Sequence, residues 1–135
     1  YDLLKEVIKN GTARKAKTLK RPDFAGKTGT TNDLMDAWFA GFNSDIVTVT
    51  WMGYDQPKSL GNKETGSRAA LPIWIDYMRP LLKDYPIKNL VKPEGIIPYK
   101  INKKTGMTNN ADENGFYEYF YEEYPPFDNS YFVIN

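Results

Sequence analysis

The residues best suited to chemistry form one short polar run, Gly26-Lys27-Thr28-Gly29-Thr30-Thr31-Asn32. The two glycines let a ligand approach the backbone closely, and the lysine supplies a positive charge. In a strand, the hydroxyls of Thr28 and Thr30 lie on one face, where both can donate hydrogen bonds. Recognition of a carboxylate needs these groups, so the run predicts a site for an anionic ligand.

Lys-Thr-Gly taken alone is a weak signal. Turns are rich in Gly, Thr and Asn for conformational reasons, and the chain contains the tripeptide a second time at Lys104-Thr105-Gly106. In the second copy Met107 follows the glycine in place of a threonine, and we expect no strand to pair with it. We therefore predict that the second copy is a turn, and that only the first copy carries a site.

Three strands are predicted around the first copy. Phe24 and Ala25 lead into the strand that carries the polar run, and the apolar stretch Ala37–Phe42 returns as its neighbour after a loop. The third stretch, residues 46–54, is rich in β-branched side chains and alternates apolar residues with threonines. Short turns between consecutive strands predict an antiparallel meander.

Helices are predicted before and after this meander. Apolar residues recur at helical spacing from Leu3 to Ile8, and Asn10-Gly11 is a plausible stop. The same spacing returns over residues 69–83, where Pro72 suits a first turn and Pro80 should kink or end the helix. The predicted fold class is α/β in the sense of α+β: an antiparallel sheet flanked by helices, covered on one face and open on the other.

Several motifs together resemble the transpeptidase domain of class A penicillin-binding proteins. Lys-Thr-Gly is the third signature of the wider group of serine enzymes, after Ser-x-x-Lys and Ser-Asp-Asn. The resemblance rests on Phe24 to Asn32, Asp36-Ala-Trp-Phe39 with Gly41-Phe42, Val49 to Gly53, and Ala70-Leu-Pro-Ile-Trp74. It implies part of a penicillin-binding or serine β-lactamase-like domain, completed by another chain segment. Residues 1–84 would form the C-terminal half of that domain, and residues 85–135 an irregular, aromatic-rich tail.

The resemblance also implies an activity. Enzymes of this family cross-link peptidoglycan: a serine attacks the amide between two terminal D-alanines of a stem peptide, and β-lactams mimic that donor. By resemblance, Lys27 and Thr30 are catalytic. The residues implied in binding the substrate or the β-lactam are Lys27, Thr28, Gly29, Thr30, Thr31 and Asn32. The two hydroxyls of Thr28 and Thr30 would hold the carboxylate, and the Thr30 N–H would be one oxyanion donor.

The chain lacks the nucleophile that this chemistry requires. No lysine stands three residues after any serine (Ser44, Ser59, Ser67, Ser130), there is no Ser-x-Asn, and there is neither His nor Cys. We therefore expect both serine motifs on an N-terminal remainder of the same protein, which completes the sandwich. The other expected partners are peptidoglycan stem peptides ending in D-Ala-D-Ala and β-lactam antibiotics.

Composition excludes several other classes of function. Eighteen Lys plus Arg against seventeen Asp plus Glu leave a net charge of +1, which argues against a nucleic-acid partner. Without Cys or His a zinc site is nearly excluded, and we expect no cofactor. No run approaches the roughly 18 apolar residues of a membrane span. The resemblance to class A penicillin-binding proteins implies attachment to the inner membrane only through a missing N-terminal anchor, with this domain on the periplasmic side.

Two segments leave other functions open. Residues 12–22 contain five cationic side chains and no acidic one, and the tail mixes tyrosines and phenylalanines with acidic residues. We interpret the first as a solvated connecting loop and the second as a tail that docks its aromatic rings on the main domain. Two alternatives remain: a noncatalytic module that binds cell-wall polymer, and a D,D-carboxypeptidase or β-lactamase of the same superfamily.

Overall fold

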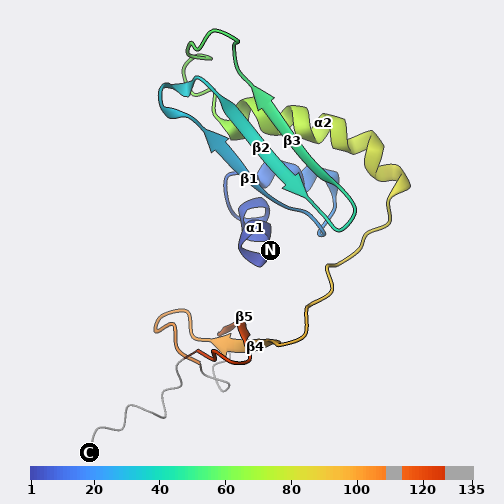
Figure 1. Cartoon of the computed structure of the whole chain (residues 1–135), viewed down its shortest axis with the longest axis vertical. Helices are drawn as coiled ribbons and strands as arrows, with labels where there is room; N and C mark the ends of the chain where they lie inside the picture. Colours follow the sequence, from blue (N-terminus) through green and yellow to red (C-terminus); the bar gives the residue numbers. More distant parts are fainter. Residues whose placement is uncertain (109–113, 127–135) are drawn as a thin grey trace, which may run out of the picture. The chain divides into compact units, whose positions relative to one another are not determined.

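A computed structural model describes residues 1–108 and 114–126 of the chain. It divides into two compact units, Tyr1–Leu90 and Val91–Asn135. In the described part of the chain, the first unit holds the helices and a three-stranded sheet, and the second holds a two-stranded sheet (Figure 1). The assignment of residues 1–84 to a transpeptidase domain, and the docking of the tail on it, stay predictions.

The three-stranded sheet is the predicted meander. Strands β1 (Ala25–Thr30), β2 (Ala37–Phe42) and β3 (Val47–Met52) lie in the order β1-β2-β3, and both pairs are antiparallel. The loop from β1 to β2 contains a short 3₁₀ turn, η2 (Asn32–Leu34). The mixture of helices with an antiparallel sheet confirms the predicted fold class.

The helices cover one face of this sheet (Figure 1). Helix α1 (Asp2–Lys9) is capped by Asn10, the predicted stop. The predicted helix over residues 69–83 is a continuous series: a π-helical turn η3 (Gly66–Ala70), α2 (Leu71–Leu81) and a 3₁₀ turn η4 (Leu82–Asp84). Pro72 lies at the start of α2, as predicted, directly after the π-helical turn.

The prediction of a plain loop over residues 12–22 is wrong in one respect. Four of its five basic residues (Arg14, Lys15, Lys17 and Lys20) are exposed, but Arg14–Leu19 winds into a 3₁₀ helix, η1, and the Arg21 side chain is buried. The reason is the apolar content of the segment, because Ala13 and Ala16 are buried and Leu19 packs against the core. The segment is thus a packed connection with a solvated cationic face.

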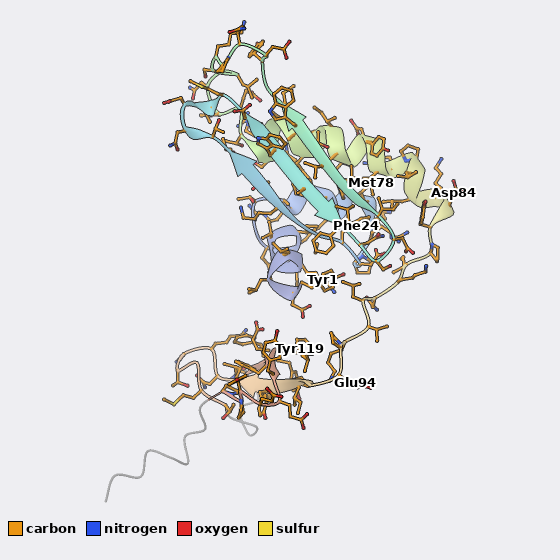
Figure 2. The ribbon with its side chains drawn as sticks, viewed as in Figure 1. Tyr1, Phe24, Met78, Asp84, Glu94 and Tyr119 are labelled. Carbon is orange, nitrogen blue, oxygen red and sulfur yellow. The ribbon has the colours of Figure 1, made fainter. Side chains whose placement is uncertain are left out.

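The core lies between the sheet and α2. Trp74 of α2 is fully buried, and its ring packs edge-on against Phe39 of β2 and Phe24, with ring centroids 4.9 Å and 5.3 Å away. The indole N–H donates to the Thr48 carbonyl of β3 at 3.1 Å. Phe24 and Met78, which are labelled in Figure 2, belong to the same buried cluster. The aromatic cluster therefore fixes α2 across the meander.

The opposite face of the sheet is open in the described part of the chain. Trp38 pairs with Trp51 across β2 and β3, and both side chains are more than 40% exposed, as is Val49. Soluble monomeric proteins rarely expose apolar side chains together on one face of a sheet. The one-sided sheet predicted from the sequence is therefore what the structure shows.

The prediction of an irregular tail is wrong for part of the second unit. Strands β4 (Ile96–Ile101) and β5 (Phe116–Tyr121) pair antiparallel. Along β5 the less exposed residues, Glu118 and Phe120, alternate with exposed ones. Tyr99 of β4 packs edge-on against Phe120 of β5, with ring centroids 5.9 Å apart. Pro98 obscured this strand in the sequence, although a two-stranded sheet consists of edges, where proline is tolerated.

Candidate substrate-binding strand

The candidate site is the outer edge of β1. In the described part of the chain β2 pairs with one side of β1, and no strand pairs with the other. The Thr31 N–H donates to the Asp36 carbonyl at 3.0 Å. Because hydrogen-bonded and non-hydrogen-bonded pairs alternate along an antiparallel ladder, the backbone groups of Thr28 and Thr30 point away from β2. A ligand that lies along this edge can therefore pair with them as an added strand would.

The hydroxyls of Thr28 and Thr30 share the helix-covered face of β1. The Thr28 Oγ1 lies 2.7 Å from the Oγ1 of Thr12, in the connection after α1, and either atom can donate. The Thr30 Oγ1 accepts a hydrogen bond from the Gly66 N–H at 3.0 Å, at the start of η3. Each hydroxyl therefore has a partner within the protein, and the bond to Gly66 leaves the hydrogen of the Thr30 hydroxyl available to donate.

Lys27 belongs to the opposite, open face of β1. It pairs with Ala40, and its side chain is exposed. The Lys27 Nζ turns back toward the strand and donates to the Thr28 carbonyl at 2.9 Å. Since that carbonyl points to the outer edge, the ammonium stands at the same edge as the backbone groups of Thr28 and Thr30.

Thr31 and Asn32 lie where the hairpin turns. The Thr31 Oγ1 accepts a hydrogen bond from the Asp36 N–H at 2.8 Å, so this hydroxyl closes the loop between β1 and β2. Asn32 begins η2 and is exposed. The structure thus brings Lys27, Thr28 and Thr30 together along one edge, whereas Thr31 is tied to the loop.

Two glycines allow neighbouring segments of the fold to approach each other closely. A Cβ on Gly26 would come within 2.7 Å of the Ala40 carbonyl oxygen on β2. A Cβ on Gly66 would overlap the carbonyl oxygens of Trp38 and Gly29. The start of η3 therefore packs directly on the backbone of β1 and β2, which places the Gly66 N–H against Thr30.

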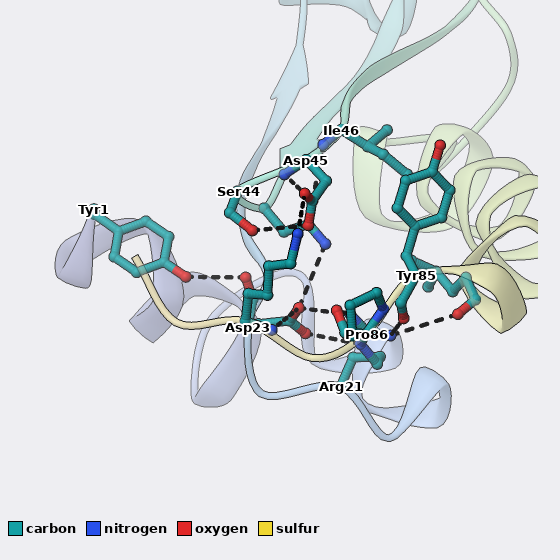
Figure 3. A network of polar contacts seen from close by, with 11 residues as sticks. Tyr1, Arg21, Asp23, Ser44, Asp45, Ile46, Tyr85 and Pro86 are labelled. Atoms are coloured by element: carbon teal, nitrogen blue, oxygen red, sulfur yellow. Dashed lines mark hydrogen bonds and ion pairs between the residues drawn. The ribbon is translucent and has the colours of Figure 1, made fainter. Parts of the chain in front are cut away.

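A buried ion pair anchors the residues that precede β1 (Figure 3). The Arg21 guanidinium donates to both carboxylate oxygens of Asp23, at 2.9 Å and 2.6 Å, and the two side chains are 9% and 0% exposed. The same guanidinium donates to the carbonyls of Tyr85 and Pro86 at 2.7 Å and 2.9 Å. Arg21 thereby joins the entrance of β1 to the chain that follows η4.

The hydrogen bonds around Arg21 and Asp23 shift the pKa values of these side chains. Burial opposes ionisation of Asp23, but the hydrogen bonds from Arg21 outweigh it and hold the pKa of the carboxyl below its ordinary value. The bond to Asp23 raises the pKa of Arg21. Nearby, a hydrogen bond at 2.8 Å from the Lys88 ammonium lowers the pKa of Asp45. The buried pair is therefore ionised at neutral pH.

The described residues contain no group of three or more His, Cys, Asp or Glu side chains that could hold a metal ion. Within residues 1–108 and 114–126, no helix is long and apolar enough to cross a membrane.

Two of these contacts could not be found from the sequence. Thr12 and Gly66 are 16 and 36 residues away from the hydroxyls that they contact. The sequence places Thr12 in a basic connection, and the residues around Gly66 carry no pattern that indicates a partner on β1. Only the fold, which brings the end of α1 and the start of η3 against the strand, joins them to the site.

The fold and the strand motif define a class of protein. No family model matches the chain. The 2.6 Å crystal structure of penicillin-binding protein 1A from Haemophilus influenzae matches with a TM-score of 0.83 and 36% identity, over 92% of this chain and 20% of that chain. The chain therefore has the fold of a part of a penicillin-binding protein.

Sequence relatives indicate which kind of penicillin-binding protein the chain resembles. Penicillin-binding protein 1A from Pseudomonas aeruginosa is 50% identical over 125 residues, which are 92% of this chain and 15% of that protein. The same protein from Neisseria lactamica is 50% identical over 97 residues, or 72% of this chain and 12% of that protein. The chain is a relative of penicillin-binding protein 1A, as its motifs predicted, and it spans less than a quarter of the length of each of these relatives.

Proposed function

We propose that this chain is the C-terminal part of the transpeptidase domain of a peptidoglycan-synthesising enzyme, and that β1 is the strand on which its substrate lies. The observation that carries the proposal is the outer edge of β1. There the backbone groups of Thr28 and Thr30, their hydroxyls and the Lys27 ammonium meet without a pairing strand among the described residues. The relatives named penicillin-binding protein 1A support the same conclusion.

The proposed reaction is acyl transfer through a serine on the remainder of the protein. The serine oxygen attacks the amide between the two terminal D-alanines of a stem peptide, and the terminal D-alanine leaves as the C–N bond breaks. An amine of a neighbouring stem then attacks the ester, forms the cross-link and releases the serine. A β-lactam acylates the same serine but has no leaving group that departs, so the ester persists.

Each residue of the edge has a role in this reaction. The hydroxyls of Thr28 and Thr30 hold the terminal carboxylate of the substrate, and the Thr30 N–H is one donor to the developing oxyanion. The Lys27 ammonium adds positive potential where both negative charges gather. Gly29, between the two threonines, leaves room on the open face for the ligand.

The location proposed for the whole protein follows from the same family. Its missing N-terminal part would anchor it in the inner membrane and hold this domain on the periplasmic side, where peptidoglycan is built. The partners would be the stem peptides and the segment that carries Ser-x-x-Lys and Ser-x-Asn.

Removal of the two hydroxyls tests the carboxylate site. In the complete enzyme, the double variant Thr28→Val and Thr30→Val keeps the β-branched shape of the strand but removes two donors to a charged group, each worth about 1.5–3 kcal/mol. We expect the second-order rate of acylation by a fluorescent penicillin to fall at least about a hundredfold.

Two controls separate chemistry from folding. Valine at position 30 also removes the acceptor of the Gly66 N–H, so Thr30→Ser, which keeps that oxygen, should acylate close to the parent rate. Thr31→Val should matter less, because Thr31 closes the loop. If the double variant acylates like the parent, the proposed site is wrong. Cell-wall polymer binding without any penicillin labelling would favour the noncatalytic module instead.

A further inference from the structure

Thr12 lies beside the candidate site, although no part of the proposed reaction uses it. The N–H groups on both sides of it, those of Gly11 and Ala13, each donate to the Val7 carbonyl at 3.1 Å. Ala13 is fully buried, so the backbone at this point cannot move freely. This backbone places the Thr12 hydroxyl at the end of α1, 2.7 Å from the Thr28 hydroxyl.

The direction of this hydrogen bond decides what Thr28 can do. A hydroxyl has one hydrogen to donate, so a Thr28 that donates to Thr12 has none for an anion. Thr30 avoids this conflict, because its partner is the Gly66 N–H, which can only donate. The Thr12 hydroxyl can act in either direction, so it can leave the hydrogen of Thr28 available.

We propose that Thr12 is a positioning residue that donates its hydrogen to the Thr28 Oγ1 and thereby aims the Thr28 hydrogen at the bound carboxylate. The inference rests on the proposed function, because it assumes that Thr28 donates to a carboxylate. The negative charge polarises the Thr28 hydroxyl, which makes its oxygen a better acceptor for Thr12, so the two bonds strengthen each other. Thr12 and Gly66 then perform the same task for the two hydroxyls of the strand.

The test uses the complete enzyme and compares a fluorescent penicillin with its carboxyl methyl ester. Thr12→Val removes the hydroxyl at an exposed position and keeps the shape of the side chain. It should slow acylation by the penicillin roughly three- to tenfold, the effect of one neutral hydrogen bond, and leave acylation by the ester unchanged. Thr12→Ser, which keeps the hydroxyl, should restore the parent rate, and Thr28→Val should show a larger loss with the same preference.

The outcomes distinguish this inference from the function on which it rests. An equal loss for the acid and the ester at Thr12→Val would show a structural role and overturn the inference, as would no loss for either ligand. A loss at Thr28→Val without one at Thr12→Val overturns the inference alone. If Thr28→Val does not distinguish the acid from the ester, the carboxylate site itself is wrong.

Discussion

The two copies of Lys-Thr-Gly adopt different structures in one chain. The first copy lies in β1, where each residue pairs with one on β2. The second copy lies in the turn after β4, where Gly106 has a φ of +71°. The likeness of the copies extends beyond the tripeptide, since a threonine and an asparagine follow each at the same spacing. The conformation is therefore set by what surrounds the copies.

The surroundings differ in a way that physical chemistry explains. Before the second copy, the Asn102 Oδ1 accepts hydrogen bonds from the N–H groups of Lys104 and Thr105 at 2.8 Å and 3.0 Å, which holds the backbone in a turn. Before the first copy stands the buried pair of Arg21 and Asp23, followed by the buried Phe24. The buried residues before the first copy hold it in an extended strand. Before the second copy, hydrogen bonds from two backbone N–H groups to the Asn102 side chain hold the chain in a turn.

The largest expected effect comes from breaking that anchor. Asp23→Ala leaves the almost fully buried Arg21 without its carboxylate, and the loss of one partner of a buried pair costs about 3–5 kcal/mol. Hydrogen exchange of the complete enzyme should show faster exchange of the β1 amides, while the β4 amides keep their protection. Glu6→Ala, which breaks the exposed pair with Lys9, is the matched control and should leave exchange of the β1 amides almost unchanged, because solvent screens an exposed pair. Equal effects of the two variants would contradict the anchoring role.

Acid should act on the same anchor. The folded pKa of Asp23 is below its unfolded value, so its contribution to stability is complete above the unfolded pKa of about 3.9 and is lost as the pH falls through the folded pKa. Protection of the β1 amides should therefore decrease below about pH 4, and this decrease should be smaller in Asp23→Ala. An unchanged pH dependence in the variant would assign the acid sensitivity to other carboxylates.

The next prediction compares Lys27 with Lys104, the lysines of the two copies. Lys27→Ala removes an ammonium at the proposed site, and the loss of one electrostatic stabiliser slows acylation by about 10²- to 10³-fold. Lys104→Ala changes an exposed turn residue and should leave the rate unchanged. The measurement is the second-order rate of penicillin acylation, with a thermal melt for each variant. Equal losses at both lysines would show that the first copy was wrongly chosen.

The sequence predicts the elements of the first unit well, because each has a strong local signal. The alternation over residues 46–54 and the helical spacing before Asn10 and after Ala69 each match an element of the structure. The edge motif was identified through its likeness to a family, and its residue types alone indicate only an anion. The fold then supplies what the motif cannot, namely which backbone groups point outward.

What the sequence misses depends on partners that are far apart along the chain. The contacts of Thr12 and Gly66 with β1 exist only after the helices pack on the sheet. Arg21 looks like one more cation in a basic stretch, yet its guanidinium lies inside the protein and binds carbonyls of the chain after η4. The β4 and β5 hairpin was missed because a proline and a long connection concealed the pairing. Local sequence patterns indicate secondary-structure propensity and exposure, whereas these contacts depend on the tertiary fold.

The smallest expected effect concerns Gly29 and Gly106, the glycines of the two copies, and tests whether the copies differ in backbone conformation. Gly106 lies in the left-handed region, where a Cβ strains the backbone by about 1–2 kcal/mol, while Gly29 does not. Gly106→Ala should therefore lower the stability of the hairpin by about 1 kcal/mol, with no change in acylation. Gly106→Asn should cost less, because asparagine tolerates this conformation.

At Gly29, alanine would bring a Cβ to 3.2 Å from the Trp38 Cβ, so Gly29→Ala should change the candidate site and slow acylation. Hydrogen exchange of the β4 and β5 amides measures the first effect and penicillin acylation the second, and a loss of acylation in Gly106→Ala would show that the turn contributes to the reaction after all.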